Sequence, residues 1–305
     1  LKTLDILIHP FCPFTSEHLY QTVFEGKQSI LLDKWPQYQE SRVNEEIEES
    51  FDIMKDIVSI SSAARMKGKL KRRWPLNEAQ ICVKKNQKVK LESLSDLLKS
   101  QLNVEKFNIV ETEKDGGLEQ LLELKELGLP VKATLELERK KIGPKAKQHM
   151  GKLVSTFLET NPDEIIPILQ KDGKYDFNID DQKISLEKED FIVNFDADDN
   201  FAVAKRDDFI VFISTLRNKE MMAKGLVKDV ARRLQTLRKE RGYNPTDVLE
   251  VASILELDDE SLEMIKGKDE ELAFLVRVKK VNFEKSCKEY KEDDIDGQKI
   301  KISVE

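Results

Sequence analysis

The period of the hydrophobic residues changes at Pro75, and this change limits what the chain can fold into. Before Pro75, apolar residues recur every three or four residues from Glu45 onward, at Ile47, Phe51, Met54 and Val58, which predicts one buried helical stripe. After Pro75, short runs with the two-residue period of strands alternate with helical segments, which is typical of α/β units. We therefore predict an α+β multi-domain fold, with an α-helical bundle followed by mixed α/β domains.

The same pattern predicts where the domains begin and end. We expect a helical domain at 1–78, an α/β subdomain at 79–172 and a second α/β subdomain at 173–305. The last subdomain is predicted to include a basic helix at 217–241, a final strand at 273–283 and a turn or tail at 289–297. No internal repeat is evident in the sequence.

The overall composition argues against a protein that binds polyanions over its whole surface. The 305 residues include 51 Lys and Arg against 58 Asp and Glu, which gives a net charge of −7. Hydrophobic residues make up 39% of the chain, which is enough for real cores under a charged exterior. Any role in binding nucleic acid must therefore come from local basic patches.

The cysteines and the apolar runs give a prediction about compartment. Cys12, Cys82 and Cys287 lie far apart and form no Cys-x-x-Cys pair, which argues against a disulfide framework and a zinc knuckle. No apolar run approaches the roughly 18 residues of a membrane span, so we expect no membrane partner. The chain opens inside an apolar-periodic segment without Met, which we interpret as a fragment of a larger cytoplasmic protein.

The segment at 224–247 combines helical spacing with many basic residues. A helical wheel predicts a core face of four residues: Leu226, Val230, Leu234 and Leu237. The far side carries a stripe of basic and amide residues: Lys228, Arg232, Gln235 and Lys239. Gly242 is predicted to end the helix. The stripe is either an ordinary solvated face or a surface that meets a polyanion.

A second basic cluster lies just before Pro75. It contains six cations within nine residues and no acid: Arg65, Lys67, Lys69, Lys71, Arg72 and Arg73. Trp74 follows directly, and cations beside a ring that can stack on an unpaired base are what single-stranded RNA requires. The alternative is a basic loop with Trp74 packed in the core.

The sequence contains no recognisable catalytic centre. The Gly-x-Ser-x-Gly and Gly-x4-Gly-Lys-Ser/Thr motifs are absent. The histidines His9, His18 and His149 have no metal-ligand spacing to one another or to cysteine. We therefore expect no catalytic residue and no metal site in this chain.

Three segments carry a family resemblance. The segment "HPFCPFTSEHLYQTVF" at 9–24 resembles the anticodon-binding helical domain of class I aminoacyl-tRNA synthetases for branched aliphatic amino acids. The segment "IVSISSAARMKGKLKRRWPLNEAQICV" at 57–83 is similar to the place where isoleucyl-tRNA synthetases leave that helical bundle. The segment "MMAKGLVKDVARRLQTLRKERGYNPTDVLEV" at 221–251 resembles their C-terminal α/β domain. Together they resemble the archaeal and eukaryotic type of the isoleucyl family.

This resemblance implies the function of a larger enzyme, which attaches isoleucine to its tRNA with ATP and Mg²⁺. The chain would be the C-terminal part that binds the anticodon stem-loop, with an upstream catalytic domain of the same chain as its other partner. The family's signatures His-Ile-Gly-His and Lys-Met-Ser-Lys-Ser are absent here, as is the editing domain, so the fragment itself is expected to be non-catalytic and to need no cofactor.

The resemblance also implies which residues bind tRNA. They are Arg65, Lys67, Lys69, Lys71, Arg72, Arg73, Trp74, Lys228, Arg232, Lys239 and Tyr243. Trp74 or Tyr243 would stack on a splayed anticodon base. Two alternatives stay open, namely a free-standing RNA-binding paralogue and a protein-docking domain that uses the acidic stretch at 284–296.

Overall fold

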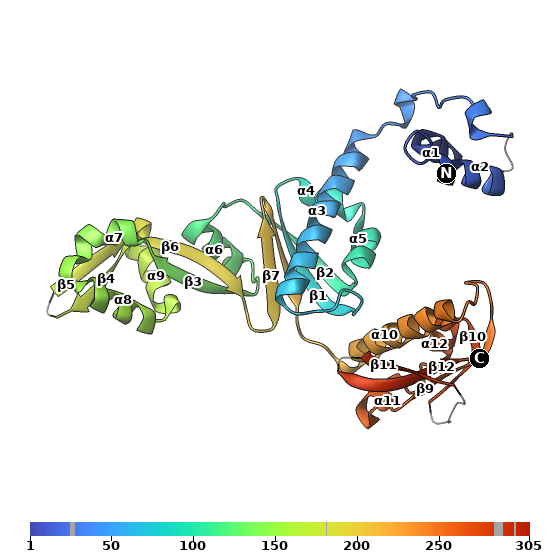
Figure 1. Cartoon of the computed structure of the whole chain (residues 1–305). Helices are drawn as coiled ribbons and strands as arrows, with labels where there is room; N and C mark the ends of the chain where they lie inside the picture. The colour runs from blue at the N-terminus through green and yellow to red at the C-terminus, as the bar shows by residue number, and fades with distance from the viewer. Residues whose placement is uncertain (25–27, 181, 284–288, 296) are drawn as a thin grey trace. The chain divides into compact units, whose positions relative to one another are not determined.

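The chain divides into two compact units. The computed structural model describes residues 1–24, 28–180, 182–283, 289–295 and 297–305 (Figure 1). The first unit runs from Leu1 to Glu48 and the second from Glu49 to Glu305. Cys287 and part of the acidic stretch at 284–296 lie outside the described residues.

The first unit is helical. It contains α1 (Lys2–Ile8), α2 (Pro13–Val23), two 3₁₀ turns (Ile30–Leu32 and Glu40–Arg42) and the first residues of α3. The Asp33 carboxylate lies 2.7 Å from both the Lys2 ammonium and the Tyr20 hydroxyl. These two partners hold the pKa of Asp33 well below its ordinary value. One charged carboxylate thus ties α1 and α2 to the loop that follows them.

The second unit begins with α3 and a four-stranded sheet. The elements are α3 (Glu45–Lys67), β1 (Leu76–Lys84), α4 (Gln87–Glu92), α5 (Ser95–Leu102), β2 (Val104–Thr112), β7 (Phe201–Arg206) and β8 (Phe209–Ser214). The strand order is β2-β1-β8-β7, with β1 and β2 parallel and the other pairs antiparallel. All six residues of β8 are buried, because separate hydrophobic cores lie against the two faces of this sheet.

A long excursion separates β2 from β7. It comprises α6 (Gly117–Glu126), β3 (Val131–Leu137), α7 (Arg139–Ala146), η3 (Lys147–His149), α8 (Met150–Glu159), α9 (Pro162–Asp172), β4 (Lys174–Ile179), β5 (Gln182–Glu187), η4 (Lys188–Asp190) and β6 (Phe191–Ala197). β3 pairs with β6 and β4 pairs with β5, both antiparallel. Leu121, Leu153 and Leu186 of this excursion share one core with Phe212 of β8, so the excursion packs on the first sheet.

The C-terminal part repeats the helix-and-sheet plan. Its elements are α10 (Lys219–Glu240), β9 (Leu249–Leu255), α11 (Asp259–Ile265), α12 (Asp269–Val276), β10 (Val278–Asn282), β11 (Lys291–Ile295) and β12 (Gln298–Val304). The strand order is β10-β9-β12-β11 (Figure 1). The predicted core face of α10 is confirmed, because its four apolar residues are buried in the core of this sheet: Leu226, Val230, Leu234 and Leu237. Gly242 follows the helix at a φ of 80°, as predicted for a helix end.

The two sheets have the same topology and the same register. In each, a helix precedes the first strand, two helices lead to a parallel edge strand, and a closing hairpin places its second strand against the first strand. Leu76 opposite Val104 corresponds to Leu249 opposite Val278. Likewise, Ala79 opposite Ile213 corresponds to Ala252 opposite Val304. We call α3, β1, α4, α5, β2, β7 and β8 the first repeat, and α10, β9, α11, α12, β10, β11 and β12 the second repeat.

One buried arginine occupies the same place in each repeat. Arg65 is 4% exposed and Arg238 is 5% exposed, and neither guanidinium pairs with a carboxylate among the described residues. Arg65 donates to the carbonyls of residues 71, 74, 102 and 103, which lie 6, 9, 37 and 38 positions later. Arg238 donates to those of residues 244, 247, 276 and 277, at 6, 9, 38 and 39 positions later. Each arginine therefore ties its helix to the loop before the first strand and to the end of the second crossover helix.

The structure differs from the sequence-based expectations in several places. The repeat is present although no repeat is evident in the sequence, because it is carried by topology and hydrogen bonds more than by residue identity. The expected strand at 273–283 is helical through Val276, and the expected turn at 289–297 contains β11, while β12 after it was not predicted. The expected boundary at 78/79 falls inside β1. The expected boundary at 172/173 assigns β7 and β8 to a different subdomain from β1, although the three strands share one sheet.

We expect Arg65→Met and Arg238→Met each to lower the free energy of unfolding by about 3 kcal/mol or more. Each change leaves several buried carbonyls without a charged donor, and unsatisfied buried groups cost about 1–3 kcal/mol each. Urea unfolding followed by tryptophan fluorescence measures the effect.

The matched control for these variants is Arg139→Met on α7, since Arg139 is an exposed helical arginine. Its unfolding free energy should stay within about 0.5 kcal/mol of the wild type. A buried-arginine variant as stable as this control would contradict the role assigned to the two guanidinium groups.

Candidate nucleic-acid interface

The two basic segments meet in one groove. The basic groove is lined by the loop after α3 and by α10, through Lys71, Arg72, Arg73, Asp229, Arg232 and Arg233. Its volume is about 430 Å³, and its described residues comprise five cations and one carboxylate. The expected site residues Lys71, Arg72 and Arg73 thus lie beside Arg232, which the sequence placed on a distant helix.

Asp229, the single carboxylate among the described residues of the groove, already has partners from the loop. Asp229 is 2% exposed and accepts hydrogen bonds from the Lys71 ammonium at 2.8 Å and the Trp74 indole N–H at 2.9 Å. Arg73 approaches its other oxygen at 3.5 Å. Burial works to raise the pKa of Asp229, but the bonds from Lys71 and Trp74 outweigh it and lower the pKa below its ordinary value.

The remaining cations of the groove differ in whether they already have hydrogen-bond partners. Arg233 donates to the main-chain oxygen of Asp294 at 2.7 Å and to that of Asp229 at 3.3 Å, so it holds β11 against α10. Arg72 and Arg232 are exposed, and among the described residues neither has a carboxylate within ion-pair distance. These two guanidinium groups are therefore the ones that the groove offers to an anion.

Trp74 is buried, which corrects the expectation that it stacks on an RNA base. Its exposed fraction is 7%, and its ring lies so close to Gly225 of α10 that an added Cβ there would be 2.4 Å from a ring atom. Cations lie over the ring as well, Lys71 at 5.1 Å and Arg217 at 4.9 Å from its centroid. Trp74 fastens the loop to α10, so its faces are not free for a base.

Arg65 is also placed in the interior, which corrects the expectation that it contacts phosphate. Its four carbonyl bonds, of 2.8 to 3.1 Å, use both terminal nitrogens of the guanidinium. Burial, and then the nearby charges of Arg217 and Arg72, lower the pKa of Arg65 to about 10, so it stays charged at neutral pH. Arg65 therefore does not belong to the surface cluster of cations that the sequence predicted.

The other expected site residues lie at the surface. Lys67 and Lys69 are exposed at the end of α3 and just after it. Lys228, Arg232, Gln235 and Lys239 are all exposed along one face of α10, as the helical wheel predicted. We call these four residues the α10 stripe. Tyr243 is half-buried at the C-terminal end of α10.

A second hollow opens at that end of α10. The α10 pocket has a volume of about 670 Å³ and is lined by Gln235, Arg238, Lys239, Tyr243, Asn244, Pro245, Leu275, Val276 and Arg277. Among the described lining residues, three are cationic and none is acidic. The stripe joins the two hollows, because Arg232 lines the groove while Gln235 and Lys239 line the pocket.

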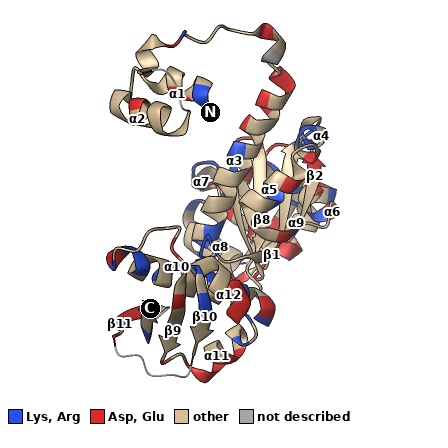
Figure 2. Cartoon of the chain, turned by 90° about the vertical axis from the view of Figure 1, so that its right-hand side faces the viewer, with Lys and Arg blue, Asp and Glu red and all other residues tan. Residues whose placement is uncertain are grey.

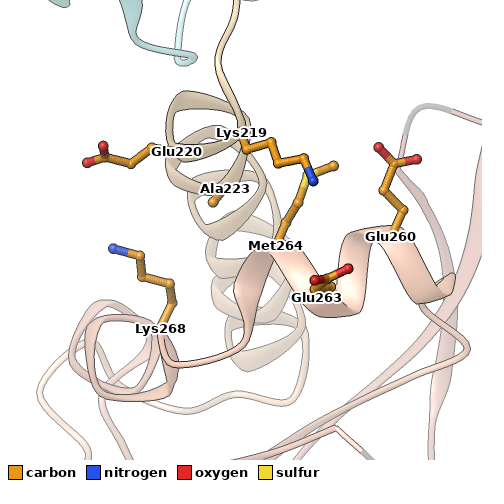
Figure 3. Close-up of a pocket in the computed structure, with 7 residues that line it drawn as sticks. All are labelled: Lys219, Glu220, Ala223, Glu260, Glu263, Met264 and Lys268. Atoms are coloured by element: carbon orange, nitrogen blue, oxygen red, sulfur yellow. The ribbon is translucent and has the colours of Figure 1, made fainter.

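The opposite end of α10 has a different character. A hollow of about 270 Å³ lies there between α10 and α11, with Ala223 and Met264 as its apolar lining (Figure 3). Its charged residues are of both signs: Lys219, Glu220, Glu260, Glu263 and Lys268. Acidic residues also gather in the first turns of α11 and α12 (Figure 2). Of the hollows on α10, those toward its C-terminal half are the ones suited to a polyanion.

Several residues that build this interface were not predicted. Asp229 and Arg217 gave no signal in the sequence, because their roles depend on a tryptophan that is remote in the chain. Arg277 sits in the left-handed region at a φ of 57°, inside a segment predicted as a strand. A helix end before it could have been inferred only from the buried Leu272 and Val276 spacing.

Three further features of the structure concern a candidate nucleophile, metal sites and membrane-spanning helices. Burial, and then the charge of Glu123, raise the pKa of the Cys82 thiol to about 12, so it is not a nucleophile. The described residues contain no group of three His, Cys, Asp or Glu side chains placed to hold a metal ion. In the described part of the chain, no helix is both long enough and apolar enough to cross a membrane.

The chain is similar to known proteins over most of its length. Residues 1–81 match the anticodon-binding domain of tRNA ligase. Isoleucine--tRNA ligase of Pyrococcus furiosus is 27% identical over 93% of this chain and 25% of its own length. Isoleucine--tRNA ligases of Sulfolobus acidocaldarius and Bacteroides thetaiotaomicron are 27% and 28% identical over 87% and 82% of this chain. The chain spans about a quarter of the length of these curated relatives, and the family resemblance of the sequence is confirmed.

We expect Gly225→Ala to destabilise the protein by about 1–3 kcal/mol, because the new methyl group overlaps the Trp74 ring. Urea unfolding and the tryptophan emission spectrum report whether the ring still packs on the helix. Gly151→Ala on α8 is the matched control, since nothing lies within 4 Å of its added Cβ. That change should leave stability equal or raise it by up to about 1 kcal/mol. Equal effects of the two substitutions would contradict the Trp74 packing.

We expect Asp229→Asn to cost about 1.5–3 kcal/mol at neutral pH, because it removes a charged acceptor of two hydrogen bonds. The pKa of Asp229 is lowered in the folded state, so its stabilising contribution is full above the ordinary value of 3.8 and is lost as the pH falls through the folded value. The gap in unfolding free energy between wild type and variant should therefore be constant from about pH 5 to 7 and shrink below about pH 4.

The exposed Asp199 provides the control, as Asp199→Asn changes the same charge in a loop. Its unfolding free energy should follow the wild type at every pH. A gap for Asp229→Asn that stayed constant down to about pH 3 would contradict the assigned titration.

Proposed function

We propose that this chain, which is related over most of its length to isoleucine--tRNA ligases, is the region of such a ligase that binds the anticodon arm of tRNA. The ligase as a whole would join isoleucine to its tRNA with ATP and Mg²⁺ in the cytoplasm. Its catalytic domain would lie in the remainder of the longer chain. This region would serve the reaction by holding the tRNA and would itself perform no chemistry.

The basic groove is the observation that carries this proposal. The whole chain has a net charge of −7, yet the groove brings together cations from two segments that are distant in sequence. Among the described residues, Asp229 is the only acid in its lining; it is 2% exposed and already accepts hydrogen bonds from Lys71 and Trp74. A cation-rich surface on an acidic protein favours binding to one strand of a nucleic acid at a defined place.

The role of each interface residue would depend on whether its side chain is exposed and already has a partner. Arg72 and Arg232 have guanidinium groups without carboxylate partners among the described residues, and they would pair with phosphates in a bidentate manner. Lys67, Lys69 and Lys228 would add salt-dependent attraction from exposed positions. Trp74, Asp229 and Arg65 would fix the loop that carries the first set of cations.

The test is a titration of the chain with isoleucine tRNA and with valine tRNA at two salt concentrations. We expect Arg72→Gln with Arg232→Gln to weaken binding and to flatten its dependence on salt. Removing one phosphate interaction lowers the slope of log K against log salt by about 0.7 to 0.9, so removing two lowers it by about 1.4 to 1.8.

The control is Lys55→Gln with Lys183→Gln, which changes the net charge equally at exposed lysines on α3 and β5. This control should keep the wild-type slope. Equal slopes for both double variants would remove the groove from the tRNA site. Absence of any tRNA binding by the wild-type chain would instead favour a protein-docking role.

A further inference from the structure

We infer that the α10 pocket takes the base of one unpaired nucleotide, which stacks on Tyr243 while an adjacent phosphate pairs with Lys239 and Arg277. This inference rests on the proposed tRNA-binding function and adds to it a subsite for a single-stranded base. The ligand class is an unpaired ribonucleotide of an RNA loop.

The lining of the pocket has the composition that a nucleobase requires. An aromatic ring from Tyr243 and apolar surface from Pro245 and Leu275 form its walls, with the amides Gln235 and Asn244 among them. The volume of about 670 Å³ lies in the range of small-molecule sites, which is roughly 300–1,000 Å³. Stacking on an aromatic face suits any base, and neighbouring amides can bond the edges of the base.

The walls of the pocket are held rigid from inside. Arg238 donates to the carbonyls of Asn244, Val276 and Arg277 at 2.5 to 3.2 Å, and these residues all line the pocket. The Gln235 amide donates to the carbonyl of Leu275 at 2.8 Å. Helix α10, the loop after it and the end of α12 are thereby joined before any ligand arrives, which lowers the entropic cost of binding.

The rim of the pocket carries two exposed cationic side chains. Lys239 and Arg277 are exposed, and neither side chain has a carboxylate partner among the described residues. In the part of the chain that the structure describes, no carboxylate lines the pocket. An apolar cleft with a cationic rim favours a ligand that is both flat and anionic, as a nucleotide is.

The first repeat shows that the scaffold needs none of these features. At the position of Tyr243, five residues after the buried arginine, it has Leu70, and the main-chain N–H of each donates to the carbonyl of its arginine. At the position of Arg277 it has Asn103, also in the left-handed region. The Asn103 amide donates to the carbonyls of Arg72 and Arg73 at 3.3 and 3.0 Å and so is bonded to its own loop.

The two repeats therefore share a frame but differ at the pocket. At these positions the first repeat has a hydrogen-bonded amide and a buried leucine, whereas the second has a half-buried aromatic ring and a guanidinium without a carboxylate partner among the described residues. Because the frame folds with either set, ligand binding is the reason we assign to the second set. The α10 stripe then leads from the groove to the pocket, and Arg232 and Lys239 lie about 10 Å apart along the helix.

The experiment compares two RNAs on the whole 305-residue chain. One is a hairpin with a seven-nucleotide single-stranded loop, and the other is a blunt duplex with the same number of phosphates. We expect the wild type to prefer the hairpin, and Tyr243→Ala to weaken hairpin binding by about 5- to 150-fold without changing duplex binding. Tyr243→Phe keeps the ring and should restore the preference for the hairpin.

A second variant keeps the test valid if Tyr243→Ala does not fold. Arg277→Asn installs the residue of the first repeat, and asparagine tolerates the left-handed backbone there. We expect it to weaken hairpin binding more than duplex binding, while far-UV circular dichroism stays that of the wild type.

The outcomes separate the pocket from the groove. Equal effects of the pocket variants on hairpin and duplex would overturn the base subsite, and the proposed function would stand if Arg72→Gln with Arg232→Gln still weakened both RNAs. Binding of neither RNA by the wild type would overturn both proposals.

Discussion

The second unit depends on two arginine side chains that are buried without carboxylate partners among the described residues. A buried guanidinium carries a large desolvation cost, which four carbonyl acceptors offset in each repeat. Because the fork of donors is planar and rigid, it fixes the directions of the chain segments that supply those acceptors. Each arginine therefore determines where a loop leaves its helix, and the loops carry the interface.

A second constraint connects the repeats to each other. Gly225 is where α10 lets the Trp74 ring approach its backbone, and Asp229, one helical turn later, accepts the indole N–H. The same carboxylate accepts from Lys71. This packing turns a basic loop and a basic helix into the two walls of one groove, and it leaves Arg72 and Arg232 facing outward. Burial of Asp229, the one acid among the described residues of the groove, thus leaves a cationic surface on an acidic protein.

The repeat explains how one frame can support two different surfaces. The frame is determined by strand register and by arginine-to-carbonyl bonds, which involve the main chain and tolerate different side chains. Side chains at the left-handed position after the second crossover helix are then free to differ, and Asn103 and Arg277 do. Sequence comparison of the halves does not reveal this relation, because main-chain hydrogen bonds leave little trace in residue identity.

The sequence by itself determined the α+β class, the helical stripe that begins near Glu45, the core face of α10 and the stripe opposite it, because these depend on hydrophobic period. It also determined the family resemblance. Only the tertiary structure decided which cations are at the surface. Arg65 and Trp74 belong to the same sequence cluster as Arg72 and Arg73, yet Arg65 and Trp74 are buried. Their burial depends on carbonyl and carboxylate partners from segments far along the chain, which offset the cost of desolvation.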